Sequence, residues 1–260
     1  MQRRRHRLNQ ILSAVLIRGQ IDTSALASEL AVSQATIRRD LAALEQQRLI
    51  SRTHGGAIIH TAFNDLPLSY KTAQDLPEKQ RIARCAAQFL DGARVIGTTG
   101  GTTVSQFARL LRDRDGLTVV TNAVNIAVDL LANPRMRVFL AGGEVRGSSQ
   151  EAVGHSAEAF LSDYHTDVAF LGVDGVDAVV GCTNYDPAGA RVNAVLFQRA
   201  RRKVVLADAT KIGRVALAQV CRMGEVDVLI TDGRAPAAAL DQIRRQGCRV
   251  ICAHEAEPGA

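Results

Sequence analysis

Two adjacent arginines, Arg38 and Arg39, are the residues of this sequence best suited to recognising another molecule. They lie in "VSQATIRRDL", residues 32–41, and "RTHGGA" follows at residues 52–57. A guanidinium group can donate two parallel N–H groups to a guanine edge, or it can pair with a phosphate. The arginines therefore suggest contact with a nucleic acid, and the question is which elements would hold them.

The arginines fall in a predicted helix that begins after Ser33, whose hydroxyl can cap it. Ile37, Leu41 and Leu44 recur at helical spacing and form its inward face. The outward face carries small, amide and basic side chains, which let the helix axis approach a surface: Ala35, Arg39, Ala42 and Gln46.

On that outward face we assign Arg39 to a base edge and Arg38, on the flank, to a phosphate. The leading end of the helix normally enters the major groove first, and here it comprises Ser33, Gln34, Ala35 and Thr36. An ordinary solvent-exposed face is the alternative. Asp40 favours that alternative, because a carboxylate facing phosphates weakens binding, although its position on the wheel is lateral.

Two helices precede this one. The first carries apolar residues from Leu8 to Leu16 and ends at Gly19, and the second begins after Asp22 or Thr23. Short helices joined by a tight turn predict a helix-turn-helix. The following "RLISRTHGGAIIH" predicts a β-hairpin.

This hairpin can act as a wing that lays Arg52 and His54 along the phosphate backbone. His54 is equally well explained as a plain turn residue. Charge supports the DNA interpretation, since residues 1–60 hold nine arginines and four acidic residues, a net +5, whereas residues 61–260 carry only +1. A solvated basic face would show the same charge.

The rest of the chain predicts a different architecture. Seven short apolar runs alternate with helical stretches, which indicates an open, mainly parallel α/β sheet: "RVIGTTGG", "LTVVTNA", "RVFLAGG", "DVAFLGVDG", "KVVLADATK", "DVLITDG" and "RVICAHE". Residues 60–77 lack periodicity and contain Pro67 and Pro77, so we expect a linker there. The predicted domains are residues 1–59 and 78–260.

Small and polar residues gather where these strands end, and ligands of such sheets bind there. In "TTGGTT" the glycines allow an anion to approach the backbone closely, and the threonine hydroxyls and the first N–H groups of the following helix can bind it. We therefore predict that a phosphate binds to this loop, which comprises Thr99, Gly100, Gly101, Thr102 and Thr103. The pattern matches neither the dinucleotide nor the Walker motif. A plain turn is the alternative.

Other strand ends add candidates for the same ligand site: Asn122, Gly143, Asp174 and Lys211. Lys211 can pair with a phosphate, and Asp174 or Asp177 can accept hydrogen bonds from sugar hydroxyls. Each residue taken singly also fits a structural role, as Asp208 does if it only caps the turn before Lys211.

No cofactor or metal ligand set is expected. The five cysteines are scattered, and Cys248 and Cys252 alone suggest a metal but lack partners of zinc-site spacing. No apolar run is long enough to span a membrane, and the short apolar stretch after "MQRRRHRLNQ" lacks a cleavage pattern, so we expect a cytoplasmic protein without a membrane partner.

From about Arg7 to Ala253 these motifs resemble the DeoR family of bacterial transcriptional regulators. "VSQATIRRDLAALEQQRLISRTHGGA" resembles the DNA-binding signature of that family, and "TGGTT", "VVTNA", "LAGG", "FLGVDG", "ADATK" and "VDVLITD" resemble the marks of its sensing domain. The resemblance implies a winged helix-turn-helix followed by a domain similar to ribose-5-phosphate isomerase. It also implies a repressor of carbohydrate catabolic genes that a phosphorylated sugar or related metabolite releases from operator DNA.

The sequence departs from that family at two places. Thr99 stands where relatives often have Asp, and residues 182–194 lack their usual His, Glu and basic residue, so we expect an altered effector site. An isomerase-like enzyme with a basic appendage remains the alternative function. In it Asp174, Asp177 and Lys211 would supply a carboxylate base and a partner that holds the enediolate charge. Reading a two-fold operator requires paired recognition helices, so we expect a homo-oligomer, a dimer or a tetramer.

Overall fold

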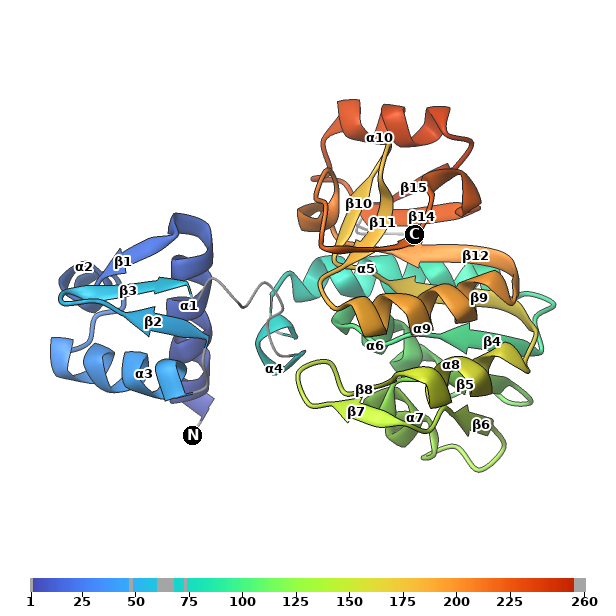
Figure 1. The fold of residues 1–260 in the computed structure, drawn as a ribbon, viewed down its shortest axis with the longest axis horizontal. Coiled ribbons are helices and arrows are strands. Elements are labelled where there is room, and N and C mark those ends of the chain that lie inside the picture. The colour runs from blue at the N-terminus through green and yellow to red at the C-terminus, as the bar shows by residue number, and fades with distance from the viewer. Residues whose placement is uncertain (1, 47–48, 60–67, 73, 255–260) are drawn as a thin grey trace, which may run out of the picture. The chain divides into compact units, whose positions relative to one another are not determined.

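The computed structural model describes residues 2–46, 49–59, 68–72 and 74–254 (Figure 1). The chain divides into two compact units, Met1–Leu66 and Pro67–Ala260. By the functions that the sequence predicts for them, the first is called the DNA-reading unit and the second the sensor unit.

The DNA-reading unit packs three helices against a small antiparallel sheet. Gly19 ends the first helix with φ 72°, and the Asp22 carboxylate caps the second by accepting hydrogen bonds from the backbone N–H groups of Ser24 and Ala25. The elements are α1 (Gln2–Arg18), β1 (Gln20–Asp22), α2 (Thr23–Glu29), α3 (Gln34–Gln46), β2 (Ile50–Arg52) and β3 (Gly56–Ile59).

The predicted helix-turn-helix and wing are both present in this unit. Ile37, Leu41 and Leu44 of α3 are buried, as their spacing predicted, and β2 and β3 form the hairpin. Strand β1 was not predicted. It pairs with β3 in the order β1-β3-β2, and three residues are too few to show a period-two pattern.

All seven predicted runs form strands of one parallel sheet in the sensor unit. Their order across the sheet is β15-β14-β12-β9-β4-β5-β6, and every neighbouring pair is parallel. The strands are β4 (Val95–Thr98), β5 (Thr118–Thr121), β6 (Arg137–Leu140), β9 (Thr166–Gly172), β12 (Ala200–Leu206), β14 (Val228–Asp232) and β15 (Arg249–Ala253).

The strand order contains a reversal at β4 and β9. From β4 the chain builds outward through β5 to β6, then returns to the other side of β4 and builds outward from β9 to β15. Neighbours β4 and β9 thus form a topological switch point, and ligands of open α/β sheets bind in the crevice beyond the carboxyl ends of such strands. These ends are Thr98 and Gly172.

Helices cover both faces of the sheet. Successive side chains along a strand point to opposite faces, so both sets are buried under helices. Val168 and Phe170 pack under one set of helices, while Ala169 and Leu171 pack under the other. The first set is α5 (Leu76–Ala86), α6 (Thr102–Leu111) and α7 (Val124–Leu130), and the second is α8 (His155–Ser162), α9 (Pro187–Gln198) and α10 (Ala237–Arg245).

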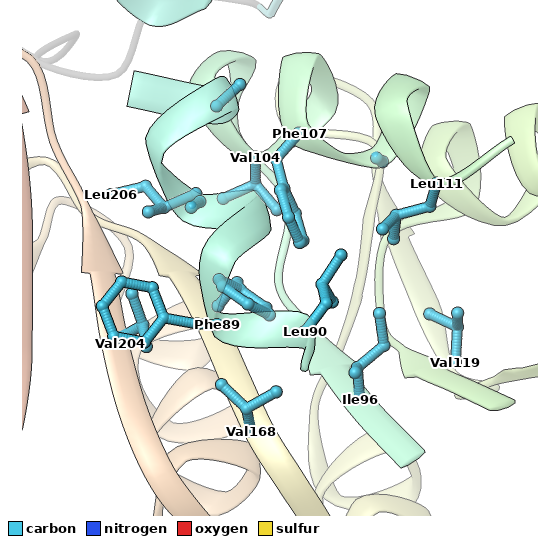
Figure 2. Packing of buried hydrophobic residues seen from close by; sticks show 14 of the residues in the cluster. Phe89, Leu90, Ile96, Val104, Phe107, Leu111, Val119, Val168, Val204 and Leu206 are labelled. Carbon is cyan, nitrogen blue, oxygen red and sulfur yellow. The ribbon is translucent and has the colours of Figure 1, made fainter. Parts of the chain in front are cut away.

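The first of these two cores is drawn in Figure 2. Phe107 of α6 packs against Phe170 of β9 with ring centroids 4.1 Å apart, and both are fully buried. Burying an aromatic or aliphatic side chain of this size contributes about 1.5–3 kcal/mol to stability. This packing fixes the start of α6 against the ends of β4 and β9.

Two small antiparallel sheets stand beside the main one and were not predicted. One is the hairpin of β7 (Glu144–Arg146) and β8 (Glu151–Val153). The other orders its strands β10-β11-β13, with β10 (Gly175–Asp177), β11 (Gly181–Asn184) and β13 (Ala218–Cys221). Strands of three or four residues leave little pattern in a sequence.

The predicted linker extends too far toward the carboxyl end. Helix α4 (Leu68–Lys71) follows Pro67, and Pro77 lies inside α5 near its start, where proline is well tolerated. The Leu68 N–H donates to the Ser148 carbonyl at 2.7 Å, which ties this segment to the sensor unit. Residues 60–67 of the predicted linker lie outside the described residues.

Candidate DNA interface and effector site

The outward face of α3 is exposed as its helical spacing predicted. Arg38 and Arg39 are both exposed, as are Gln34 and Ala35 at its amino-terminal end. The Ser33 hydroxyl accepts a hydrogen bond from the Thr36 N–H at 3.2 Å, so Ser33 caps the helix. A ligand can therefore reach the whole side of α3 opposite its buried residues.

Asp40, the residue that counted against DNA binding, does not belong to this face. Its side chain is 2 % exposed and accepts hydrogen bonds from Arg7 Nε at 2.6 Å and Arg4 Nε at 3.3 Å. The carboxylate therefore joins α3 to α1, and its charge is matched inside the unit. A phosphate approaching α3 meets Arg38 and Arg39 without an opposing carboxylate from Asp40.

The wing presents Arg52 and His54, both of which are exposed. Arg52 is engaged within the unit, since its N–H donates to Glu45 Oε1 at 3.1 Å and its guanidinium lies 3.7 Å from Glu45 Oε2. A phosphate contact by Arg52 would have to replace this ion pair. Both side chains are partly exposed, so replacing it has a low free-energy cost.

At the switch point, Thr99 connects the two strand ends. Its hydroxyl accepts a hydrogen bond from the Gly172 N–H at 3.0 Å, and its own N–H donates to the Phe170 carbonyl at 3.2 Å. The strand ends approach so closely that a Cβ on Gly172 would lie 2.7 Å from the Gly100 carbonyl oxygen. Thr99 is fully buried, so its hydroxyl holds the site together.

Gly100 meets a carboxylate that the sequence did not single out. Its N–H donates to Glu151 Oε1 at 2.9 Å, and a Cβ at Gly100 would lie 2.6 Å from Glu151 Cδ. Glu151 lies on β8 and is 8 % exposed. Burial raises the pKa of its carboxyl group, while the hydrogen bond from Gly100 opposes that shift.

Asn122 and Asn193 lie beside this carboxylate. The Asn122 amide nitrogen is 3.5 Å from Glu151 Oε1, 3.3 Å from the Ala152 carbonyl and 3.5 Å from Asn193 Oδ1. Asn122 is fully buried, yet its Oδ1 atom has no hydrogen-bond partner among the described residues. Leaving a buried acceptor unpaired costs about 1–3 kcal/mol, which a ligand could remove.

Basic side chains gather nearby around two carboxylates. Lys71 Nζ pairs with Asp174 Oδ1 at 3.2 Å, and Lys79, 3 % exposed, donates to the carbonyls of Lys71 and Gln74. Burial lowers the pKa of Lys211, and the nearby Asp208 opposes the shift. Burial likewise lowers the pKa of Lys79, with Asp208 opposing and Lys211 adding to the shift. Three ammonium groups thus share one neighbourhood, which suits a dianion.

The start of α6 faces the same switch point. Gly101 caps it with φ 107°, a conformation that suits glycine, and Thr102 and Thr103 form its first turn. The first N–H groups of a helix lack acceptors within the helix, so this turn can bind an anion. The structure therefore brings Gly100, Gly101 and the two threonines to one end of the sheet.

The remaining predicted residues all make contacts within the chain. Asp174 accepts a hydrogen bond from the Tyr185 N–H at 3.2 Å besides pairing with Lys71. Asp177 accepts hydrogen bonds from the Val179 and Val180 N–H groups. Asp208 accepts one from the Thr210 N–H and so caps the turn before Lys211, which is the structural role considered for it above. Gly143 has φ 142°, and a Cβ there would lie 2.8 Å from the Val153 carbonyl oxygen, so its role is to fit the β7–β8 hairpin.

The unusual segment 182–194 has a local structural explanation. Asp186 caps α9 by accepting a hydrogen bond from the Gly189 N–H at 2.6 Å, and Pro187 takes the first position of the helix. Asp186 also pairs with Arg146 at 3.5 Å. Arg146 thus supplies a basic group at this end of the sheet from β7.

Sequence reasoning missed five residues of this site: Lys71, Lys79, Arg146, Glu151 and Asn193. The two lysines lie in or just after the predicted linker, and the others lie in short strands or inside a helix without a motif of their own. Among the described residues no three His, Cys, Asp or Glu side chains are placed to hold a metal, and Cys182, Cys221 and Cys248 are buried free thiols. None of the described helices is long and apolar enough to cross a membrane.

A winged helix-turn-helix joined to an α/β domain with a polar cluster at its switch point defines a class, that of DNA-binding regulators with a ligand-sensing domain. Comparison with family models agrees. Residues 7–63 match the DeoR-like helix-turn-helix domain, and residues 74–233 match the DeoR C terminal sensor domain. The chain therefore belongs to the DeoR family of transcriptional regulators, which sets aside the isomerase alternative.

Curated relatives match along nearly the whole chain. The HTH-type transcriptional repressor GlcR of Bacillus subtilis (strain 168) is 35 % identical over 96 % of this chain and 97 % of its own. The glycerol-3-phosphate regulon repressor of Escherichia coli (strain K12) is 31 % identical over 92 % of this chain and 94 % of its own.

Solved structures give a weaker likeness. A D-ribose-5-phosphate isomerase in complex with phospho-erythronic acid has a TM-score of 0.38 and 21 % identity, and the match covers 51 % of this chain and 52 % of that one. The fold of the sensor unit is defined by its strand order and by the match to the family model.

Proposed function

We propose that this protein represses carbohydrate catabolic genes by binding operator DNA through α3, and that a phosphorylated sugar or related metabolite releases it. Relatives named as repressors, including the glycerol-3-phosphate regulon repressor, support this function. The observation that carries the effector class is the group of three ammonium side chains at the switch point, on Lys71, Lys79 and Lys211. A doubly charged phosphate offsets the repulsion among them.

For the DNA contact, Arg39 is our choice for a guanine edge and Arg38 for a phosphate. The leading end of α3, with Ser33, Gln34 and Thr36, would enter the major groove, and the wing residues Arg52 and His54 would lie along the backbone. Support comes from the exposure of these side chains, except that of Thr36, which is half-buried, and from the inward pairing of Asp40.

For the effector, we assign the phosphate to the first turn of α6 and to Lys71 and Lys211. Gly100 would let the effector approach the backbone closely, while its N–H donates to Glu151. We assign the opposite, hydroxyl-bearing end of the effector to Asn122 and Asp174, whose side chains lie beside the same strand ends.

Operator binding also bears on assembly and location. One recognition helix reads only a few base pairs, so we propose a homodimer or a larger assembly of even number. Binding to the chromosome supports the expected cytoplasmic location. Light scattering at micromolar concentration should give a mass at least twice the 27.9 kDa of the chain, and a monomeric mass would overturn this part of the proposal.

The decisive experiment measures binding of the full chain to labelled duplex from its own promoter region, with random duplex as competitor. We expect a dissociation constant of about 10⁻⁸ M or lower that weakens as salt rises, because arginine contacts release counterions. Sugar phosphates are then titrated into the complex, with inorganic phosphate and unphosphorylated sugars as controls. Equal competition by random duplex would refute the operator function, and failure of every sugar phosphate to release DNA would refute the effector class.

A further inference from the structure

Glu151 is a buried carboxylate whose nearest partners are neutral. Its Oε1 atom accepts a hydrogen bond from the Gly100 N–H at 2.9 Å and lies 3.5 Å from the amide nitrogen of Asn122. It lies beyond the carboxyl end of β4, at the switch point that positions ligands in this class of fold. The charges of Asp174 and Arg146 also act on Glu151, with opposite effects on its pKa. A carboxylate has about four lone-pair sites, so Glu151 retains capacity to accept further hydrogen bonds.

Asn122 supplies a second acceptor next to the first. Its Oδ1 atom is buried and unpartnered among the described residues, while its Nδ2 atom faces Glu151, Ala152 and Asn193. Two buried acceptors close to one another match two neighbouring donors on a ligand. Neighbouring hydroxyl groups on a carbon chain or ring have this arrangement.

The charges of the site divide in the same way. Glu151 and Asn122 form one group, with Arg146 near Glu151, and Lys71, Lys79 and Lys211 form a second group around Asp174 and Asp208. Asp174 lies between the two groups, because it pairs with Lys71 and its charge also acts on Glu151. A ligand that spans them carries its anionic group at the lysines and its hydroxyl groups at Glu151.

We infer that Glu151 and Asn122 read two neighbouring hydroxyl groups of the effector, which makes Glu151 a specificity-determining residue and the effector a phosphorylated polyol. The inference rests on the proposed function, since it assumes the phosphate at the lysine cluster. A ligand that lacks one of the hydroxyls leaves a buried acceptor unpaired, and sites built on such hydrogen bonds reject the deoxy analogue strongly.

The test compares matched pairs of ligands that differ by one hydroxyl group. Ribose 5-phosphate is paired with 2-deoxyribose 5-phosphate, and glycerol 3-phosphate with 3-hydroxypropyl phosphate, by calorimetric titration of the full chain. In the wild type we expect the hydroxylated member of at least one pair to bind about 100-fold more tightly or better. Glu151→Gln, which keeps the size of the side chain, should reduce this ratio to about tenfold or less.

The matched control is Asp167→Asn. The Asp167 carboxylate also accepts hydrogen bonds from backbone N–H groups, those of Arg94 and Val95 at 2.9 and 3.0 Å, but at the opposite end of the same strands. This change should leave the ratio as it is in the wild type. A general weakening of the fold would lower both affinities together and preserve the ratio, so the ratio separates recognition from stability.

Three outcomes overturn the inference. Equal binding of both members of every pair by the wild type removes the role of the hydroxyl groups while leaving a phosphate effector in place. An unchanged ratio in Glu151→Gln removes the role of Glu151. Failure of every phosphorylated ligand to bind removes the proposed effector class together with the inference.

Discussion

The DNA-reading unit and the sensor unit differ in how their proposed recognition residues are distributed along the sequence. In the DNA-reading unit one helix presents consecutive turns of exposed side chains, and the only buried charge among its key residues, Asp40, is matched by Arg7 and Arg4. In the sensor unit the polar groups of the site come from separate segments, including Lys71, Asn122 and Glu151. The outward face of α3 can be predicted from one stretch of sequence. The polar cluster of the sensor unit forms only when separate segments come together on folding.

Among the variants that test this difference, the largest effect is expected from replacing Asp40, through the stability of the DNA-reading unit. Asp40→Ala removes the partner of two arginines and leaves the Arg7 guanidinium, 21 % exposed, without its carboxylate. Breaking a largely buried ion pair should destabilise the DNA-reading unit by about 3 kcal/mol. Hydrogen exchange at the amides of α1 and α3 measures this, because it reports each unit separately.

Glu29→Ala is the matched control, since Glu29 pairs with Arg18 at 2.7 Å on the exposed surface of the same unit. Exposed pairs contribute little, so exchange at α1 and α3 should not change measurably. Equal exchange rates in both variants would show that burial of Asp40 does not hold α3 to α1.

Next in size is the difference between the two arginines of α3. Arg39→Ala should cost about 1–3 kcal/mol on the specific operator and relax sequence preference at one or two positions. Arg38→Ala should weaken binding to all duplexes and reduce the slope of log affinity against log salt by about one. Fluorescence anisotropy with operator and random duplexes measures both, and identical effects of the two changes would contradict the assignment.

A smaller effect is expected at Lys211. Lys211→Met removes an ammonium group but keeps a side chain of similar length, and loss of one charge-assisted hydrogen bond to phosphate should weaken effector binding about tenfold or more. Lys203→Met serves as the control and should bind as the wild type does, because Lys203 lies within β12 with its ammonium 5.5 Å from the centroid of the Phe197 ring. Titration calorimetry measures both, and an unaffected Lys211→Met would move the phosphate elsewhere.

The smallest effect concerns pH. Burial raises the pKa of Glu151 above 4.5, so the folded state holds its proton more tightly than the unfolded chain does. The cost of ionising Glu151 is therefore absent below about pH 4.5 and grows as the pH rises toward the pKa of the folded state. Glu151→Gln cannot ionise, so its stability relative to the wild type should rise as the pH increases from about 4.5 toward the pKa of Glu151 in the folded state.

Thermal unfolding of the sensor unit at several pH values measures this difference. Asp167→Asn should show the opposite dependence of stability on pH, because hydrogen bonds from the backbone N–H groups of Val95 and Arg94 lower the pKa of Asp167. Its carboxylate therefore stabilises the folded state above the unfolded pKa, and this contribution disappears as the pH falls. A constant gap between Glu151→Gln and the wild type across the pH range would contradict the account of Glu151.

Much of the fold follows from local patterns. The seven strands of the main sheet are apolar runs bounded by glycine and small polar residues, and α3 shows its period in Ile37, Leu41 and Leu44. The sequence did not predict the short elements β1, β7, β8 and α4, because three or four residues carry too little periodicity. Of the effector site, only residues directly after predicted strands could be found, which left out Glu151 and Lys71.

The sequence by itself determined the helix-turn-helix, the outward arginines and the parallel sheet, because each depends on residues near one another along the chain. Only the tertiary structure decided that Asp40 turns inward to Arg7 and that Gly100 receives Glu151 instead of leaving its N–H free. These contacts join residues 33 and 51 positions apart. Such pairs are chosen by packing and by the need to satisfy buried polar groups, and neither leaves a local pattern.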